Sequence, residues 1–407
     1  MNRDERQKLG IRRWIDSGGR GVLEWATGTG KTNGSIMVIK SLYKHNPNIV
    51  VLVAVPTDVL KEQWNRELAK NQLFSVCKVE IFNTIIKQQY QVDLLVVDEC
   101  HLSASPTFIN IYNCVEYKYL LGLTATWTRL DGSEKYLEQF MSVCDTITLQ
   151  EALENNWVSS YRKYKVLLHV DMEKYWEYNT KFQQLFAYFN HDFKLVMELV
   201  KSPKKVKIWA QKCGKNDNAT RGYLAQFMKY LKLRKTFVMT HPKKFEVANK
   251  ILDFRRDKKC ILFTATVKDA ELFKSRALVL HSQKKKKENR IILETFNQLD
   301  IANIVSPKAL DAGVDVRGLS VGIALTCNSS QVTDLQRIGR VIRAEENKVA
   351  EFFTLVIAGS IEETWYNNAN KNQSYITITE DQLDVILKGG EISTRPKKGI
   401  IDIDNRF

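Results

Sequence analysis

The chain has 407 residues, and its 61 Lys and Arg against 46 Asp and Glu give a net charge of +15, which favours a polyanionic partner. A hydrophobic content of 44% and a charged content of 26% are those of a globular protein with two or three domains, and they exclude a fibrous or disordered chain. The charged N-terminus excludes a signal peptide, the apolar runs are too short to span a membrane, and seven cysteines without a CxxC pair predict neither a disulfide framework nor a zinc ribbon.

A glycine-rich loop follows the first apolar stretch. Residues 21–25 predict a strand, residues 26–32 (ATGTGKT) a loop and residues 34–43 a helix, which is typical of a phosphate-binding loop. Backbone N–H groups of such a loop surround phosphate oxygens, its Lys reaches the β and γ phosphates, and its Thr binds Mg²⁺. The alternative is a simple glycine turn, since Trp25 stands where the strict Walker pattern has Gly. The residues expected to bind ATP are Thr27, Gly28, Thr29, Gly30, Lys31 and Thr32, with Thr32 also on the metal.

Two carboxylates directly follow a second apolar run. A buried parallel strand is predicted at residues 93–97, and Asp98 and Glu99 come directly after it. Carboxylates at the carboxyl end of such a strand face the ligand crevice of an open α/β sheet. We therefore expect Asp98 to hold Mg²⁺ and Glu99 to orient and deprotonate the attacking water. A surface acidic pair that caps a helix is the alternative, and the phosphate loop upstream favours the metal site.

Residues 157–200 are rich in aromatic side chains. Four of them have helical spacing and predict a helix with an aromatic core face, while base stacking is the alternative. These four are Phe182, Phe186, Phe189 and Phe193.

Residues 201–235 have eleven Lys and Arg residues and a single acid, Asp217. A segment of one sign repels itself unless a polyanion neutralises it, so we expect contacts with nucleic-acid phosphates rather than a solvated face. The short run 284–287 is a further basic candidate. The expected phosphate contacts are Lys204, Lys205, Lys207, Arg234 and Lys235.

Residues 336–343 (QRIGRVIR) include Arg340 and Arg343, which lie three positions apart. On a helix, Arg340 and Arg343 would share one face and could both reach a single γ-phosphate, as arginine fingers do. An ion-paired or solvated helix face is the alternative.

Together these segments resemble the motifs of superfamily 2 helicases. Residues 28–32 (GTGKT), 98–101 (DECH), 124–126 (TAT) and 336–343 are similar to motifs I, II, III and VI, and they occur in the order of that family. The segments similar to motifs Ia, IV and V are residues 55–64, 261–263 and 309–315. The resemblance covers residues 3 to about 365 and implies an α/β protein with two tandem RecA-like parallel-sheet domains, which bind ATP and Mg²⁺ in the cleft between them and hydrolyse the ATP there.

The resemblance also implies roles for residues outside the phosphate loop. Gln7 would read the adenine edge, with an ordinary exposed helix Gln as the alternative. In motif VI, Gln336 joins the two arginines as a catalytic candidate. In motif V, Gly313 and Asp315 would contact the nucleotide. Thr57 of motif Ia and Gly313 would also touch nucleic-acid phosphates.

The basic segment is placed like the thumb-like insertion of XPB-type repair helicases and of related phage branch-migration helicases. The chain departs from those helicases in two ways. Residues 129–131 (RLD) lack the middle acid of the Arg-Glu-Asp element found in XPB-like proteins, and too few residues precede motif I for a DNA-recognition domain. The expected domains are a first RecA-like domain, a helical basic insertion, a second RecA-like domain and a C-terminal tail. Their ranges are 1–150, 151–235, 236–375 and 376–407.

These features predict an ATP-dependent DNA helicase or translocase that acts on forked or branched DNA. The alternatives are an RNA helicase and a non-processive clamp switched by ATP. The TAT and DECH segments make the chain less similar to the RNA-directed DEAD-box branch. We expect a monomer without a membrane partner in the cytoplasm, and the chain resembles a phage product acting in the cytoplasm of its host.

Overall fold

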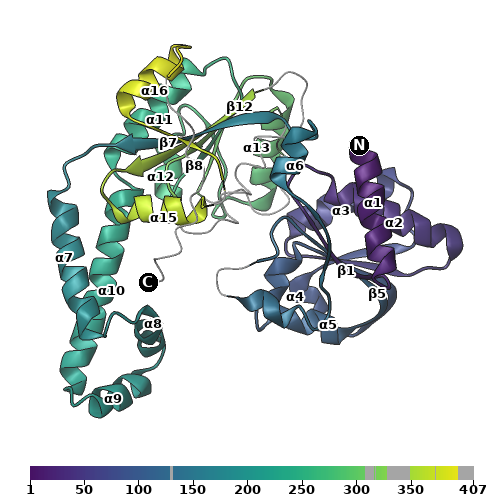
Figure 1. Cartoon of the computed structure of the whole chain (residues 1–407), viewed down its shortest axis with the longest axis horizontal. Helices are drawn as coiled ribbons and strands as arrows, with labels where there is room; N and C mark the ends of the chain where they lie inside the picture. Colours follow the sequence, from purple (N-terminus) through teal and green to yellow (C-terminus); the bar gives the residue numbers. More distant parts are fainter. Residues whose placement is uncertain (129–131, 308–315, 317, 328–348, 372, 393–407) are drawn as a thin grey trace.

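Two parallel β-sheets organise the part of the chain that the structure describes (Figure 1). This computed structural model describes all residues except 129–131, 308–315, 317, 328–348, 372 and 393–407. The expected α/β fold with two tandem parallel-sheet domains is confirmed. No helix among the described residues is long and apolar enough to cross a membrane.

The first domain contains six strands: β1 (Arg20–Trp25), β2 (Val51–Val55), β3 (Cys77–Ile81), β4 (Tyr90–Asp98), β5 (Val115–Thr124) and β6 (Val143–Ile147). Its helices are α1 (Arg3–Asp16), α2 (Lys31–His45), α3 (Asp58–Lys70), α4 (Phe82–Ile85), α5 (Ile111–Cys114) and α6 (Leu149–Glu154). The sheet order is β3-β2-β4-β5-β1-β6. Because both faces of the sheet are covered, its strands are nearly continuous apolar runs. In β2, Val51 and Val53 enter one core cluster, while Leu52 and Ala54 enter the other.

The second domain contains β7 (Ser160–Leu168), β8 (Cys260–Phe263), β9 (Leu278–Val279), β10 (Asn303–Ser306), β11 (Val321–Ala324), β12 (Val349–Ile357) and β13 (Ile376–Ile378). Its helices are α11 (Pro242–Phe254), α12 (Val267–Glu271), α13 (Lys286–Gln298), α15 (Ile361–Ala369) and α16 (Glu380–Leu387). The sheet order is β13-β7-β12-β11-β8-β10-β9.

Strand β7 corrects the range 151–235 expected for the insertion. It pairs with β12 along its whole length, so the second domain already begins there. Lysines at two core-facing positions hide this strand in the sequence. Lys163 and Lys165 are buried, and Lys165 donates to Glu363 Oε1 of α15 at 2.8 Å. The helical segment therefore lies within the second domain, after its first strand.

That segment forms an arm of four helices: α7 (Glu173–Tyr188), α8 (Phe193–Lys201), α9 (Pro203–Lys212) and α10 (Asp217–Met239). Helices α7 and α10 run side by side, with α8 and α9 at the far end (Figure 1). The arm has its own core, which includes Phe182, Phe189 and Phe227. The aromatic spacing is thus a packing feature, although it spans two helices rather than one, because α7 ends at Tyr188 and Phe193 begins α8.

The range 376–407 expected as a tail also needs correction. Strand β13 pairs with β7, and α16 places Leu383 and Leu387 in the core of the second domain. The second domain therefore extends at least to Leu387. A three-residue strand and an eight-residue helix carry too little periodicity to be predicted from the sequence.

A fully buried ion pair joins α11 to α15. Lys244 and Glu362 have side chains with 0% exposure, and Lys244 Nζ lies 2.6 Å from Glu362 Oε1 and 2.8 Å from the carbonyl of Leu325. Burial raises the pKa of Glu362, and Lys244 opposes that rise. We expect Lys244→Met to lower the free energy of unfolding by about 3–5 kcal/mol, because it leaves a carboxylate buried without its cation.

Urea unfolding followed by circular dichroism measures this change in stability. Lys243→Met is the matched control, since Lys243 pairs with Glu246 and Glu380 near the surface and each such pair contributes about 0–1 kcal/mol. Adding Glu362→Leu to Lys244→Met should recover part of the stability. Equal destabilisation by Lys243→Met and Lys244→Met would contradict the expected role of the buried pair.

Candidate ATP site and nucleic-acid groove

The phosphate loop lies between β1 and the N-terminus of α2. Gly28 and Gly30 have φ angles of 87° and 94°, which lie in the left-handed region that favours glycine. Lys31 Nζ donates to the carbonyl of Trp25 at 3.0 Å, so the ammonium folds back over the loop. A glycine-rich loop in front of a helix N-terminus is the arrangement that can hold phosphate, as the sequence predicts.

Trp25 is a core residue, which explains why it replaces the usual Gly. Its indole N–H donates to Asp145 Oδ2 at 2.7 Å. Its ring lies so close to Gly34 of α2 that a Cβ at Gly34 would come within 2.6 Å of it. Gly34 on the neighbouring helix therefore makes room for the Trp25 ring, and Gly28 and Gly30 keep their positive φ angles.

Gln7 lies against the phosphate loop. Its side chain is 1% exposed, which rules out the alternative of an ordinary exposed helix residue. Its Nε2 donates to the carbonyl of Thr29 at 2.7 Å, and its Oε1 accepts from Asn33 Nδ2 at 2.8 Å. These bonds bring α1 and the loop together, and they leave the reading of adenine by Gln7 a prediction.

Asp98 and Glu99 lie at the carboxyl end of β4, as expected. Asp98 is buried, and its Oδ2 accepts from the indole N–H of Trp64 at 2.8 Å while its Oδ1 accepts from the backbone N–H of Glu99 at 2.9 Å. Burial, and then the neighbouring Glu99 carboxylate, raise the pKa of Asp98 to about 6, while the Trp64 hydrogen bond and Lys31 lower it. Glu99 has a φ of 50°, a strained value for a residue with a side chain.

His101 connects this acidic pair to the TAT segment. Its Nδ1 lies 3.0 Å from Thr124 Oγ1 and 3.5 Å from Glu99 Oε2. Thr124 Oγ1 in turn accepts from the backbone N–H of Thr126 at 3.1 Å. The DECH and TAT segments are thus one hydrogen-bonded unit at adjacent strand ends.

The donor set fits a Mg²⁺ ion shared with a nucleotide. Among the described residues, no three His, Cys, Asp or Glu side chains are grouped so that they could hold a metal by themselves. Mg²⁺ usually binds through one or two carboxylates together with phosphates and water. A buried carboxylate at Asp98 and the hydroxyl of Thr32 at the start of α2 are the oxygen ligands that such an ion needs.

A groove of about 1020 Å³ lies between α3 of the first domain and α13 of the second. Thr57 lies at its edge and caps α3, since its Oγ1 accepts from the N–H of Leu60 at 3.3 Å. Lys286 Nζ crosses the groove to Asp58 Oδ2 at 2.5 Å. The basic side chains that line the groove are Arg66, Lys284, Lys286, Lys287 and Arg290.

The arm presents most of the predicted phosphate contacts, with one correction. Lys204, Lys207 and Lys235 are exposed, and so is Lys205, which pairs with Glu198 at 3.0 Å. Arg234 is 7% exposed, lies 3.8 Å from the centre of the Phe182 ring and donates to Asn179 Oδ1 at 2.9 Å. Arg234 therefore holds α7 and α10 together, and its expected contact with nucleic acid is wrong.

Five predicted residues lie outside the described part of the chain, as does the RLD segment at residues 129–131. The five are Gly313, Asp315, Gln336, Arg340 and Arg343.

Two residues that hold the site together were not predicted from the sequence. Trp64 lies in the segment similar to motif Ia, but only the fold brings its indole to Asp98. Arg6 precedes Gln7 and donates to Asp145 at 2.9 Å and to Glu151 at 2.6 Å. A buried arginine with two carboxylates far along the chain has no local signature.

Comparison with known proteins agrees with this geometry. The model of the helicase conserved C-terminal domain matches residues 243–345, and that of the type III restriction enzyme res subunit matches residues 1–90 and 76–129. The chain is 22% identical over 372 residues to the DNA 3'-5' translocase XPB2 of Sulfurisphaera tokodaii, covering 87% of this chain and 81% of the relative.

Solved structures share the fold. The RNA-bound Dbp5 of S. cerevisiae with ADP and BeF3 aligns with a TM-score of 0.59 and 13% identity, covering 94% of this chain and 91% of that one. The DNA-bound type ISP restriction-modification enzyme LlaBIII aligns with a TM-score of 0.57 and 16% identity, covering 89% of this chain and 29% of that one. With a phosphate loop, an acidic strand end and two parallel-sheet domains in place, the chain is an ATP-dependent helicase of superfamily 2 that resembles the XPB-type enzymes.

Proposed function

We propose that this helicase uses ATP hydrolysis in the cleft between its domains to move along DNA and to remodel forked or branched DNA. The observation that carries the proposal is the groove between α3 and α13, because both domains line it and five basic side chains are part of that lining. A strand bound there would contact the two domains at once. Changes in their separation would then move the strand or the protein.

Charge supports a nucleic acid as the occupant of the groove. Arg66 comes from the first domain, while Lys284, Lys286, Lys287 and Arg290 come from the second. Three acidic side chains, Asp58, Glu62 and Glu294, also line the groove, so its basic side chains are in excess. Backbone phosphates provide most of the affinity in such complexes and give no sequence preference, as a tracking motor requires.

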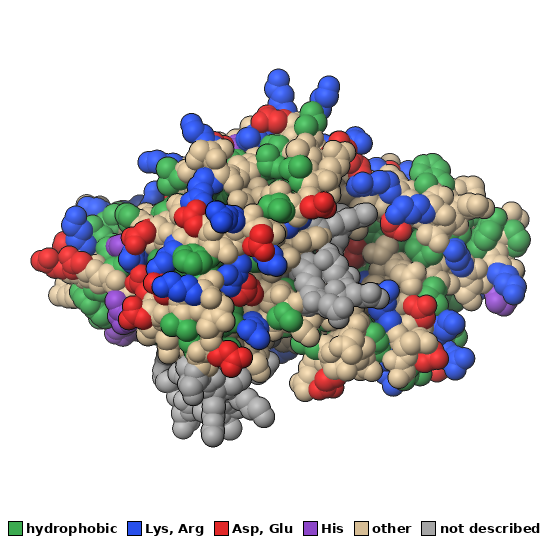
Figure 2. All heavy atoms as spheres, turned by 90° about the horizontal axis from the view of Figure 1, so that it is seen from above, with side chains coloured by type: hydrophobic (Ala, Val, Ile, Leu, Met, Phe, Trp, Pro, Cys, Tyr) green, Lys and Arg blue, Asp and Glu red, His purple; other side chains and the backbone are tan. Residues whose placement is uncertain are grey.

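The arm supports branched rather than uniform DNA. Lys204, Lys205 and Lys207 are exposed on α9, and α9 lies at the far end of the helical arm that projects from the second domain (Figure 1). On the face shown in Figure 2, by contrast, Lys and Arg side chains stand among Asp and Glu side chains. A mainly basic segment such as residues 201–235, placed apart from the groove, can hold a second duplex or a second strand of a junction.

The relative that matches over 372 residues is named as a DNA translocase, which favours DNA over RNA. An RNA helicase is the second candidate, because the fold is as similar to that of RNA-bound Dbp5 as to that of DNA-bound LlaBIII. ATP hydrolysis rates with single-stranded, duplex, forked and four-way DNA, and with RNA, decide between them. Stimulation by RNA alone would overturn the proposal.

In the proposed reaction, the residues of the site have separate tasks. The backbone of the loop and the Lys31 ammonium bind the phosphates. Glu99 orients the attacking water and accepts its proton. Bound Mg²⁺, held by Thr32 and Asp98, would neutralise charge on the β and γ phosphates. The cleft would close on ATP and open after hydrolysis.

The lysines of α9 offer a test of the arm. Replacing Lys204, Lys205 and Lys207 with Glu should make log affinity for forked DNA depend less steeply on log salt concentration. The magnitude of the slope should fall by about 1 for every phosphate that the variant no longer neutralises. Folding should be unaffected because all three side chains are exposed. Fluorescence anisotropy across a salt series measures the slope.

The matched control replaces three exposed lysines of the first domain, Lys40, Lys44 and Lys70, with Glu. It changes the net charge by the same amount at a surface that we do not assign to DNA. If both triple variants flatten the slope equally, the effect is one of total charge, and the arm is not the contact surface.

A further inference from the structure

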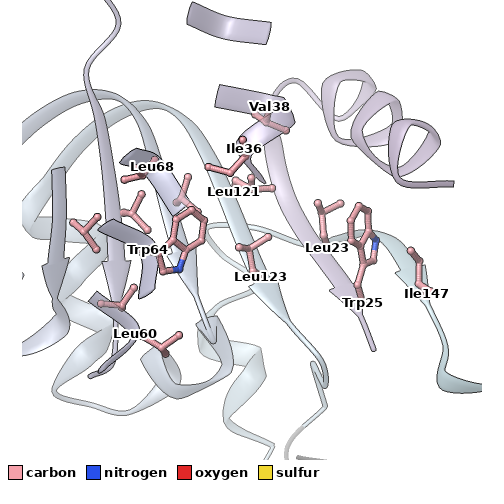
Figure 3. Close-up of a cluster of buried hydrophobic side chains, with 14 of the residues drawn as sticks. Leu23, Trp25, Ile36, Val38, Leu60, Trp64, Leu68, Leu121, Leu123 and Ile147 are labelled. Carbon is pink, nitrogen blue, oxygen red and sulfur yellow. The ribbon is translucent and has the colours of Figure 1, made fainter. Parts of the chain in front are cut away.

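Helix α3 connects the groove to the ATP site through its two faces. Leu60, Trp64 and Leu68 have the spacing of one helix face and are buried in the core of the first domain, where Figure 3 shows Trp64 between the two leucines. The opposite side of α3 lines the groove with Asp58, Glu62 and Arg66. A single helix thus touches the place where DNA is proposed to bind and the interior beside β4.

The buried face ends in a contact with the proposed metal ligand. Trp64 is 1% exposed, and its only side-chain donor points to Asp98 Oδ2 at 2.8 Å. A buried indole N–H usually finds a partner, and a backbone carbonyl suffices for that, as Trp14 of α1 shows by donating to the carbonyl of Leu120 at 3.0 Å. Trp64 instead fixes one oxygen of a catalytic carboxylate.

The other oxygen of Asp98 accepts from the backbone N–H of Glu99 at 2.9 Å. The carboxylate is therefore held by two donors, one from its own strand end and one from α3. Any shift of α3 relative to β4 would change the direction of the Trp64 donor and turn the carboxylate. Displacements of about 1 Å at a reacting centre can change rates by about 10²-fold.

We propose that Trp64 is a positioning residue that couples the occupancy of the groove to the placement of the Mg²⁺ carboxylate of Asp98. The inference rests on the proposed function, since it takes the groove as the binding place of DNA. Lys286 of α13 contacts Asp58 at the first turn of α3. Phosphates in the groove attract the same lysine and arginines, so DNA changes the forces on α3, and Trp64 passes the change to Asp98.

Coupling of this kind is reciprocal and can be measured without turnover. The probe is Mn²⁺, whose binding in the presence of a non-hydrolysable ATP analogue is followed by electron paramagnetic resonance, with and without single-stranded DNA. DNA should change the Mn²⁺ affinity of the wild-type protein by about 5-fold or more. Trp64→Phe, which keeps an aromatic ring and removes the donor, should reduce that change to less than about 2-fold.

Trp14→Phe is the matched control. It removes an indole donor from an equally buried tryptophan of the same domain, away from Asp98, and it should leave the effect of DNA at the wild-type level. Trp64→Met is a second donor-free variant in case Trp64→Phe does not fold, because a flexible Met fills irregular space.

DNA binding is measured separately by anisotropy, which keeps the two proposals distinguishable. If the wild-type protein binds no DNA, the proposed function fails and this inference fails with it. If DNA binds but the Mn²⁺ affinity still responds to it in a folded Trp64 variant, or does not respond in the wild-type protein, the inference alone is overturned. Loss of the response in Trp14→Phe would also overturn it, since the cause would then be general packing.

Discussion

Glu99→Gln should keep ATP binding near the wild-type level and lower the hydrolysis rate by about 10²–10⁴-fold. An amide has the shape of the carboxylate but cannot accept the proton of the attacking water. Glu99 lies at the strand end next to buried Asp98, so the substitution also removes one negative charge from that pair. Asp98 and Thr32, the proposed Mg²⁺ ligands, are unchanged in this variant, so the main effect should appear in turnover.

The measurement compares equilibrium binding of ATP with single-turnover hydrolysis. Lys31→Ala gives the contrasting pattern, because it removes the ammonium of the phosphate loop and should lower both affinity and turnover. A Glu99→Gln protein with near wild-type hydrolysis would show that Glu99 is not the general base.

Arg340→Ala and Arg343→Ala should each lower the turnover of bound ATP by up to about 10³-fold, with a smaller effect on affinity. Both arginines fall within the match to the helicase conserved C-terminal domain, which spans residues 243–345. In the sequence they fall between β11 and β12, outside the described residues.

Arg→Lys variants at the same positions separate charge from geometry. Lys keeps the charge but lacks the planar fork of the guanidinium, so it should restore little activity. If ATP affinity collapses and the turnover of bound ATP does not, the two arginines bind the ground state and are not arginine fingers.

The geometry of the glycine-rich loop and of the acidic strand end could be predicted because it depends on short stretches of backbone. Gly28 and Gly30 adopt the positive φ angles that such a loop requires, and Asp98 ends a strand that the apolar run marks clearly. Local sequence carries both features.

Other features depend on contacts between distant residues. Strand β7 is hidden in the sequence because Lys163 and Lys165 occupy buried positions, and their partners lie about 200 residues further along the chain, on and just after α15. Arg234 resembles its basic neighbours in the sequence, yet the Phe182 ring lies beneath it. Counting charged residues gives the net charge of a segment but not the direction in which each side chain points. Which of the basic side chains are exposed therefore depends on the fold.

Strand displacement from forked DNA tests the central claim most directly. The wild-type protein should release a labelled strand only with ATP and Mg²⁺, at a rate that follows ATP hydrolysis, and Glu99→Gln should release none. If DNA stimulates ATP hydrolysis while no strand is released from any fork or four-way junction, the protein is an ATP-switched clamp, and the proposed motor activity is contradicted.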